Sequence, residues 1–324
     1  MSTILEPEST HDSTTTAASE RVRTSFAACR LTFSWLGTTK SLSSEQKSQA
    51  AETFGAAKES ISAGKKLFDT KHESYKALTS LKSQITRFWK DNSLAYPESG
   101  IRLIRQNRID EFAHTFADFQ SQLEAGVRRL DEHFCELKEA ARIRLGSLYD
   151  STDYPSTLAD EFSVSYDFPS VEAPDYLRRL NPELYAQQSR RISERFDRAV
   201  EMAEQAFIEQ LDGLVNHLAE RLSGNDDGKP KIFRDSAVQN FGEFFNRFRE
   251  LSVNSNEQLD DLVQRCEQLI DGVQPQQLRN NESLRRSLAT NLSTVQSSLD
   301  QLLVDRPRRN ILRPNRRQED RWSL

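Results

Sequence analysis

The residues best suited to binding chemistry lie at positions 305–324, which hold seven arginines, three acids and no lysine. Arginine pairs with phosphate or carboxylate through two parallel hydrogen bonds, and an aromatic ring can stack on a base. The segment therefore predicts a site for nucleic acid or for an acidic protein surface. A solvated tail without a ligand is the alternative interpretation. The candidate residues are Arg306, Arg308, Arg309, Arg313, Arg316, Arg317 and Trp322.

The charge of this tail opposes the charge of the rest of the chain. The formal net charge is −5 for all 324 residues, of which residues 305–324 contribute +4 and the remainder −9. Attraction between the tail and the chain's own acidic body is therefore a further interpretation. Pro307 and Pro314 disfavour a helix across the tail, so we expect it to be disordered.

A weaker candidate is the acidic turn at residues 149–155, which contains Asp150 and Asp153. Turn carboxylates can hold Mg²⁺ or Ca²⁺, although these two do not follow the register of an EF-hand loop. Aspartate also caps helix ends, and the pair Tyr154-Pro155 fixes the direction in which the chain leaves the turn. The two hypotheses are a metal site, with an enzyme that uses it, and a purely structural turn.

Other catalytic and metal-binding patterns are missing from the sequence. It contains no GxxxxGK[ST] or GxGxxG phosphate loop, no HExxH zinc motif and no GxSxG nucleophile elbow. No two of the five histidines are four residues apart on a helix, so the spacing does not support a two-histidine metal site. We therefore expect a protein that is not an enzyme and that uses no metal or cofactor.

The cysteines and the hydropathy bear on the compartment. Cys29, Cys135 and Cys266 stand apart without a CxxC pair, which favours a reducing compartment over a disulfide framework. No segment approaches the roughly 18–20 apolar residues of a membrane span, and no signal peptide is recognisable. We expect a cytoplasmic protein that does not contact a membrane.

The composition predicts the fold class. Glycine and proline number only 11 and 10, and charged residues make up 29% of the chain. The mean hydropathy is −0.70, so apolar residues are confined to stripes. A chain with few turn formers favours a small number of long helices over a β-sandwich or an alternating α/β fold. The sequence predicts a mainly α-helical protein.

Heptad spacing predicts a long helical hairpin. Apolar residues recur every seven positions from Phe54 to Trp89, with Lys82 as an interruption, which predicts one coiled-coil-like helix from residue 44 to about residue 92. Such a helix would be about 73 Å long. A second amphipathic helix is expected over residues 109–148. The short turn between the two predicts an antiparallel arrangement.

A third long helix is predicted from Asn181-Pro182, a cap followed by proline at the first helical position, to about residue 222. The next helix carries Phe241, Phe244, Phe245 and Phe248, which predict packing against the third long helix, with docking into a partner groove as the alternative. The C-terminal helices are expected at 238–251, 259–270 and 275–302.

Two segments alternate apolar and polar residues and are predicted to be half-buried strands. They cover about residues 29–36 and 162–168. We pair them as a small two-stranded β ribbon that lies on helices, because an isolated ribbon is only marginally stable in water.

The predicted organisation has four parts. Nine of the first 20 residues are serine or threonine, and such a segment buries too little apolar surface to become ordered. The parts are a disordered head at 1–20, a long-helix bundle with the β ribbon at 21–224, C-terminal helices at 231–304, and the disordered tail at 305–324.

A series of short landmarks occurs in a fixed order along the chain. They are Trp35-Leu36-Gly37, Gly100-Ile101-Arg102-Leu103, Ala141 to Asp150, Asp153-Tyr154-Pro155-Ser156, Phe162 to Tyr166, Phe168-Pro169, His217 to Leu222 and Phe233-Arg234-Asp235-Ser236. In their order and spacing they resemble a bacterial and phage family catalogued as domain of unknown function number 3150. The resemblance covers roughly residues 25–305 and excludes both ends.

The resemblance implies no catalytic residues, because the family has no established activity. Its members occur in phages and mobile elements, and a place beside ring-forming ATPases of the MoxR type is implied. The leading hypothesis is a non-enzymatic helical scaffold or adaptor of such a system that binds a partner protein or itself through helix faces. The alternatives are a nucleic-acid-associated protein that uses the tail and an oligomeric coiled-coil structural protein.

Overall fold

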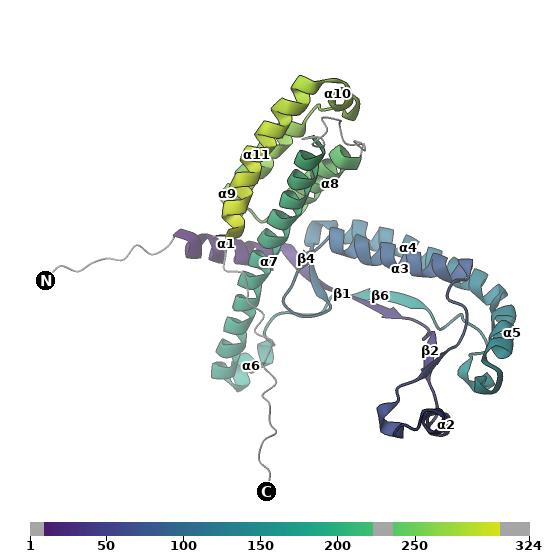
Figure 1. The fold of residues 1–324 in the computed structure, drawn as a ribbon. Helices are drawn as coiled ribbons and strands as arrows, with labels where there is room; N and C mark the ends of the chain where they lie inside the picture. Colours follow the sequence, from purple (N-terminus) through teal and green to yellow (C-terminus); the bar gives the residue numbers. More distant parts are fainter. Residues whose placement is uncertain (1–9, 223–235, 305–324) are drawn as a thin grey trace, which may run out of the picture. The chain divides into compact units, whose positions relative to one another are not determined.

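The computed structural model describes residues 10–222 and 236–304 (Figure 1). They form a mainly α-helical fold with a small antiparallel sheet, as the composition predicts. The chain divides into two compact units within a long helix. The sheet unit comprises Thr15–Val200, and the remaining residues form the helical unit, whose main described part is 201–222 and 236–304. The sequence places this division later, at the loop after residue 224.

The sheet unit combines short strands with helices of moderate length. Its elements, in chain order, are the part of α1 (Thr10–Ser25) from Thr15 onward, β1 (Phe26–Ser34), β2 (Thr39–Ser41), α2 (Ser44–Phe54), β3 (Gly64–Lys66), α3 (Glu73–Asp91), β4 (Leu94–Ala95), β5 (Ile101–Arg105), α4 (Ile109–Glu132), α5 (Phe134–Leu145), β6 (Ser163–Asp167), α6 (Asp175–Leu180) and the first part of α7 (Pro182–Leu222).

The predicted ribbon is present as the pair β1 and β6, which run antiparallel with Phe33 opposite Val164. It belongs to a four-stranded sheet of order β4-β5-β1-β6. Strand β5 pairs with the first half of β1, with Ala27 opposite Ile104. Strands β4 and β5 and the small separate pair of β2 and β3 were not predicted from the sequence.

The predicted antiparallel hairpin is formed by α3 and α4. At one end Phe88 stacks on Phe112 with ring centres 5.2 Å apart. Toward the other end α3 contacts α4 at Gly126, where a Cβ atom would lie 2.7 Å from Cδ2 of Leu78. The numbers of the contacting residues thus increase along one helix while they decrease along the other, so the two helices are antiparallel. Gly126 has no side chain and permits a close approach of the two helix axes.

The first helix of the hairpin is shorter than predicted, because the heptad pattern continues through a segment that is not helical. Helix α2 ends at Gly55, which caps it in the left-handed conformation at φ 60°. Phe54, the first residue of the predicted seam, is 79% exposed. Helix α3 begins only at Glu73. Its 19 residues span about 29 Å, and the predicted single helix of about 73 Å is wrong.

The second helix of the hairpin is interrupted once. The peptide N–H of His133 bonds to the carbonyl of Leu130, three residues back rather than four. This tighter turn separates α4 from α5 within the predicted span of 109–148.

The predicted disordered head is a helix from Thr10 onward, where α1 begins. Ala18 and Val22 in this helix are fully buried, and the hydroxyl of Ser19 donates a hydrogen bond to Asp197 in α7. The prediction was wrong for residues 10–20 because burial of a short apolar stripe stabilises a helix that the Ser/Thr-rich composition hides. The rest of the head lies outside the described residues.

The sheet is buried on both faces near β5. Ile104 and Cys29 belong to the core that α3 and α4 complete. Because side chains alternate along a strand, the buried Leu103 points to the opposite face. Tyr96, which follows β4, packs edge-on against Phe196 of α7 with ring centres 5.6 Å apart. The sheet thus lies between the hairpin and the first part of α7.

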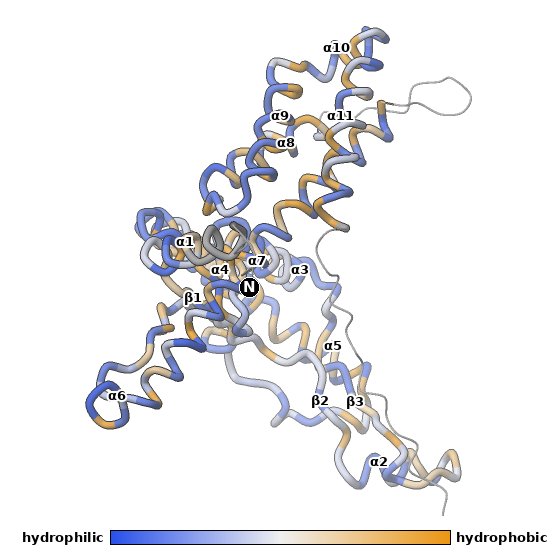
Figure 2. Tube along the Cα trace, turned by 90° about the vertical axis from the view of Figure 1, so that its left-hand side faces the viewer, coloured by the Kyte–Doolittle hydropathy of each residue, from blue (hydrophilic) through white to orange (hydrophobic). Residues whose placement is uncertain are grey.

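The helical unit contains the predicted C-terminal helices. It consists of the second part of α7, α8 (Ser236–Leu251), α9 (Glu257–Ile270), α10 (Pro275–Asn280) and α11 (Glu282–Val304). Coloured by hydropathy in Figure 2, these helices alternate between hydrophilic and hydrophobic residues along their length, as helices with one apolar face do. The helix predicted at 275–302 is divided into α10 and α11.

The third long helix and the packing of the phenylalanine-rich helix agree with the sequence. The side chain of Asn181 accepts a hydrogen bond from the Leu184 N–H at 3.0 Å and caps α7. Phe207 of α7 packs edge-on against Phe248 of α8, with ring centres 5.0 Å apart. The phenylalanines of α8 are buried in the unit itself. None of the described helices combines the length and apolar content of a membrane span.

Candidate functional site

The predicted binding tail, Arg306 to Trp322 within residues 305–324, lies outside the described residues. The described residues contribute three other features: the acidic turn, an exposed apolar corner in the sheet unit and a pocket in the helical unit.

The acidic turn is held by lysines from both strands of the β2–β3 pair. Asp153 is almost fully buried, and its carboxylate binds Lys40 of β2 and Lys65 of β3. The Lys65 Nζ lies 2.5 Å from Oδ2 of Asp153 and donates a hydrogen bond of 2.6 Å to the Leu148 carbonyl. Burial acts to raise the pKa of Asp153, but the hydrogen bonds from the two lysines hold it below its usual range.

Asp150 caps the same turn. Its carboxylate accepts hydrogen bonds from the hydroxyl and the N–H of Thr152, at 2.7 and 2.9 Å, and these bonds lower the pKa of Asp150. The structural interpretation of the turn therefore accounts for both aspartates. In the part of the chain that the structure describes, no group of three or more His, Cys, Asp or Glu side chains is placed to hold a metal ion.

Long-range contacts bring together residues that sequence spacing keeps apart. His72 at the start of α3 and His133 at the α4–α5 break lie with ring centres 5.2 Å apart.

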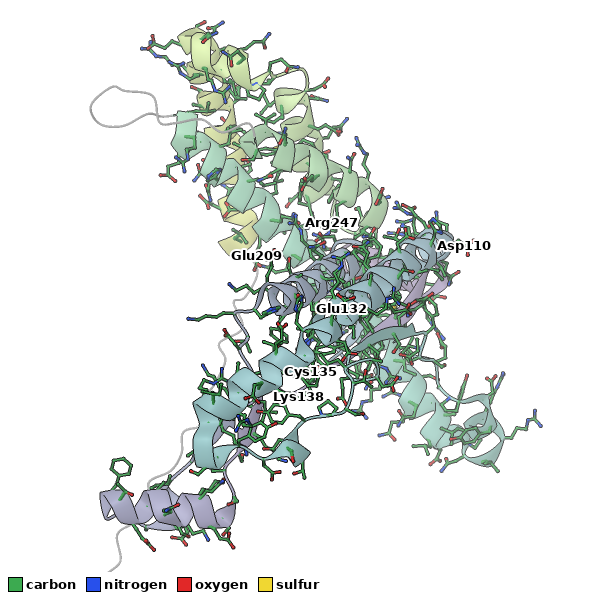
Figure 3. The ribbon with its side chains drawn as sticks, turned by 90° about the vertical axis from the view of Figure 1, so that its right-hand side faces the viewer. Asp110, Glu132, Cys135, Lys138, Glu209 and Arg247 are labelled. Carbon is green, nitrogen blue, oxygen red and sulfur yellow. The ribbon has the colours of Figure 1, made fainter. Side chains whose placement is uncertain are left out.

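Two of the thiols are buried, and burial raises the pKa of Cys29 to about 11 and that of Cys266 to about 12. Both thiols are therefore protonated at neutral pH and are poor nucleophiles. Cys135, which Figure 3 labels on α5, is exposed.

An apolar corner is formed where α6 turns into α7. Tyr176 and Leu180 lie one turn apart on α6 and are 62% and 78% exposed, and Leu184 in the first turn of α7 is 36% exposed. The exposed Arg178 and Arg179 lie between the first two. Large apolar side chains so close together on a surface mark an interaction site more often than isolated ones do.

Local signals position this corner. Pro174 precedes α6 in extended conformation, and the Asn181 cap ends one helix and starts the next. The turn is short because the Asn181 N–H also bonds to the Leu177 carbonyl at 2.8 Å. The cap was predicted from the sequence but the corner was not, because the exposure of a leucine depends on which surfaces the rest of the fold covers.

A small open pocket, with room for about one water molecule, lies in the helical unit between α7, α8, the connecting loop and the start of α9. Asn254 in the loop adopts a left-handed conformation at φ 50°, which asparagine tolerates better than most residues. The side chain of Asn256 then accepts the Leu259 N–H at 3.0 Å and starts α9. The lining includes Glu204, Phe207, Phe248, Ser252, Ser255 and Asp260.

The electrostatics of the pocket differ from those of the acidic turn. Burial raises the pKa of Asp260, and the nearby charges of Asp261, Glu204 and Glu257 raise it further. The pocket therefore places Asp260 among like charges, beside the almost fully buried rings of Phe207 and Phe248.

The aromatic wall already holds one guanidinium group. The Cζ atom of Arg247 in α8 lies 5.4 Å from the ring centre of Phe207, and its Nη1 donates a hydrogen bond of 2.6 Å to Gln210 of α7. Figure 3 labels Arg247 and Glu209 in this part of the helical unit. The Phe207 ring is thus already covered within the unit, by Arg247 and by Phe248.

Comparisons with known proteins add no assignment, since no family model, curated protein or solved structure matches the chain.

Proposed function

We propose that this chain is a non-enzymatic helical adaptor that binds a partner protein at the α6–α7 corner. The exposure of Tyr176, Leu180 and Leu184 carries the proposal, because burying a leucine side chain stabilises a complex by about 1.5–3 kcal/mol. The corner adds two arginines, a residue type enriched in the centres of protein interfaces.

The charges around the corner indicate the chemistry of the partner. Residues 172–191 hold four arginines (Arg178, Arg179, Arg190 and Arg191) and three acids (Glu172, Asp175 and Glu183), and Glu172 is paired with Arg23. A matching surface would offer an apolar groove rimmed by carboxylates. A ring ATPase of the MoxR type in a phage or mobile element is the partner class that the family resemblance implies.

A site-specific crosslink tests the proposal. Tyr176 is replaced by the photoreactive amino acid p-benzoylphenylalanine, the full chain is illuminated in its native host, and crosslinked species are identified by mass spectrometry. We expect one crosslinked protein that is lost with Leu180→Asp and retained with the matched control Phe54→Asp, because Phe54 is equally exposed elsewhere.

Two outcomes would overturn the proposal. One is a crosslink pattern unchanged by Leu180→Asp, which would remove the corner from partner binding. The other is loss of all partners after nuclease treatment, which would favour the nucleic-acid hypothesis. Circular dichroism of each variant confirms that the fold is intact.

A further inference from the structure

Two histidines meet where helix α3 begins and helix α4 ends. His72 precedes the first residue of α3, and His133 lies at the break between α4 and α5. Their ring centres are 5.2 Å apart, and the ring planes are inclined by 52°. Because the two residues come from different elements, histidine spacing along a single helix could not predict the pair. The fold thus creates a two-histidine group that the sequence spacing does not contain.

Hydrogen bonds of the main chain hold both residues in place. The His72 N–H donates to the Asp69 carbonyl, and the His72 carbonyl accepts from the Lys76 N–H in the first turn of α3. The His133 carbonyl likewise accepts from the Leu137 N–H in the first turn of α5. A ligand that binds both rings therefore meets two helix termini that already lie side by side, and little free energy is lost in bringing them together.

Each ring has a nitrogen suited to a ligand. Nδ1 of His72 is buried and forms no hydrogen bond with a described residue, and a buried polar atom without a partner costs free energy that a ligand can recover. Nδ1 of His133 lies 3.6 Å from Oε2 of Glu136. A carboxylate beside Nδ1 favours the tautomer with the proton on that nitrogen, so Nε2 of His133 keeps its lone pair.

The separation of the rings indicates the kind of ligand. Two imidazoles on one tetrahedral ion, with Zn–N bonds of about 2.0–2.1 Å, have their ring centres about 5 Å apart. Imidazole nitrogen suits Zn²⁺, Cu²⁺ and Ni²⁺, whereas Mg²⁺ and Ca²⁺ prefer oxygen. No third His, Cys, Asp or Glu among the described residues completes a metal-binding group with the pair. Water would therefore take the remaining coordination positions.

We propose that His72 and His133 together bind one divalent transition-metal ion of the zinc type, with Glu136 as the carboxylate that orients the His133 ring. The side chains of His133 and Glu136 are 46% and 82% exposed, so an ion reaches the pair from solvent. The bound ion joins the start of α3 to the α4–α5 break and stabilises the folded sheet unit. The inference does not depend on the α6–α7 corner, and its failure leaves the proposed adaptor function untouched.

A calorimetric titration of the full chain with Zn²⁺ tests the proposal. We expect binding of one equivalent, which His72→Gln weakens by more than about tenfold and Glu136→Gln by about tenfold. The matched control is His114→Gln, which removes an exposed imidazole near the other end of α4 and should leave the affinity unchanged. Equal weakening by His72→Gln and His114→Gln would overturn the proposal, and so would binding of Mg²⁺ with the same affinity.

The exposed thiol of Cys135 is a competing donor. Figure 3 labels it on α5, two residues beyond His133. If two imidazoles hold the ion, Cys135→Ser should leave the Zn²⁺ affinity unchanged. A loss in this variant as large as that of His72→Gln would place the ion on the thiolate and overturn the assignment to the histidine pair.

A second measurement needs no variant. The ring-nitrogen resonances of the histidines in the full chain are followed by NMR during the Zn²⁺ titration. One ring nitrogen of His72 and one of His133 should shift together and saturate at one equivalent, while those of the exposed His114 and His217 stay in place. Shifts confined to one histidine of the pair, or spread equally over all the histidines, would overturn the proposal.

Discussion

The two units of this protein differ in the balance of their acidic and basic side chains. Residues 15–200 hold 27 basic and 26 acidic side chains, and several of them form pairs between distant segments, such as Arg23 with Glu172 and Arg195 with Glu98. The described residues of 201–304 hold twice as many acids as bases, and Asp212 and Asp260 each lie near like charges. Ion pairs complete the sheet unit, whereas the helical unit keeps an unbalanced negative charge.

This difference in charge balance decides whether a carboxylate stabilises or destabilises the folded state. A buried carboxylate with two lysines, such as Asp153, has its charge compensated within the fold. A carboxylate among other carboxylates, such as Asp260, raises the free energy of the folded state, and an added cation lowers it. Asp153 is thus part of the ion pairing of its own unit, whereas the charge of Asp260 is opposed by the charges of its neighbours.

The largest predicted effect comes from breaking the buried ion pair of the sheet unit. Lys65→Met leaves the buried Asp153 with only the exposed Lys40, and the free energy of unfolding should fall by about 3 kcal/mol. Denaturant-dependent labelling of Cys29, in a Cys135→Ser background, measures this in the sheet unit. The double variant Lys65→Met with Asp153→Leu should recover most of the loss. A loss below 1 kcal/mol for Lys65→Met would contradict the comparison.

Removing a charge from the helical unit should increase the free energy of unfolding rather than decrease it. In the chain ending at Val304, Asp260→Asn removes one of several mutually repelling carboxylates. We expect stabilisation by about 0.5 kcal/mol after allowance for solvent screening. The buried thiol of Cys266 reports on this unit, and its labelling should slow. Faster labelling would mean that Asp260 makes a stabilising contact.

Acidification should separate the two units further. The pKa of Asp260 and Asp212 is raised in the folded state, so their ionised forms destabilise it, and this penalty is relieved as pH falls through the folded pKa toward 3.8. The pKa of Asp153 and Asp150 is lowered, so their stabilising contribution is present above 3.8 and is lost as pH falls below it. The denaturant concentration at which Cys266 becomes exposed to labelling should therefore rise on moderate acidification, before the corresponding concentration for Cys29 falls. A parallel response of both thiols would refute the contrast.

The sequence predicted helices well where caps and amphipathic spacing agreed. Helix α7 has an asparagine cap, a proline at its first position and a continuous apolar stripe, and it was predicted to its end. The first helix of the hairpin failed because Phe54 kept the seven-residue period while Gly55 ended the helix. Lys82, the interruption in the repeat, packs against the sheet with Nζ 4.5 Å from the ring centre of Trp35.

The candidate sites were less predictable, because they depend on contacts across long sequence separations. Asp153 stabilises the fold because Lys40 and Lys65 lie beside it. Asp260 destabilises it because other acids, such as Glu204, lie nearby. His72 and His133 are in contact although the sequence of the whole α3–α4 hairpin separates them. A one-dimensional pattern gives residue types but not which surfaces meet, so the acidic turn was noticed and the pocket was not.

The smallest predicted effect on stability belongs to the α6–α7 corner. Leu180 is 78% exposed, so Leu180→Asp removes no core contact and should change the free energy of unfolding by less than about 0.5 kcal/mol. Cys29 labelling of this variant should match that of the parent. The same substitution is expected to abolish the crosslink at Tyr176, because in a complex the leucine would be buried. A large loss of stability would instead assign Leu180 to folding and make the loss of the crosslink uninformative about docking.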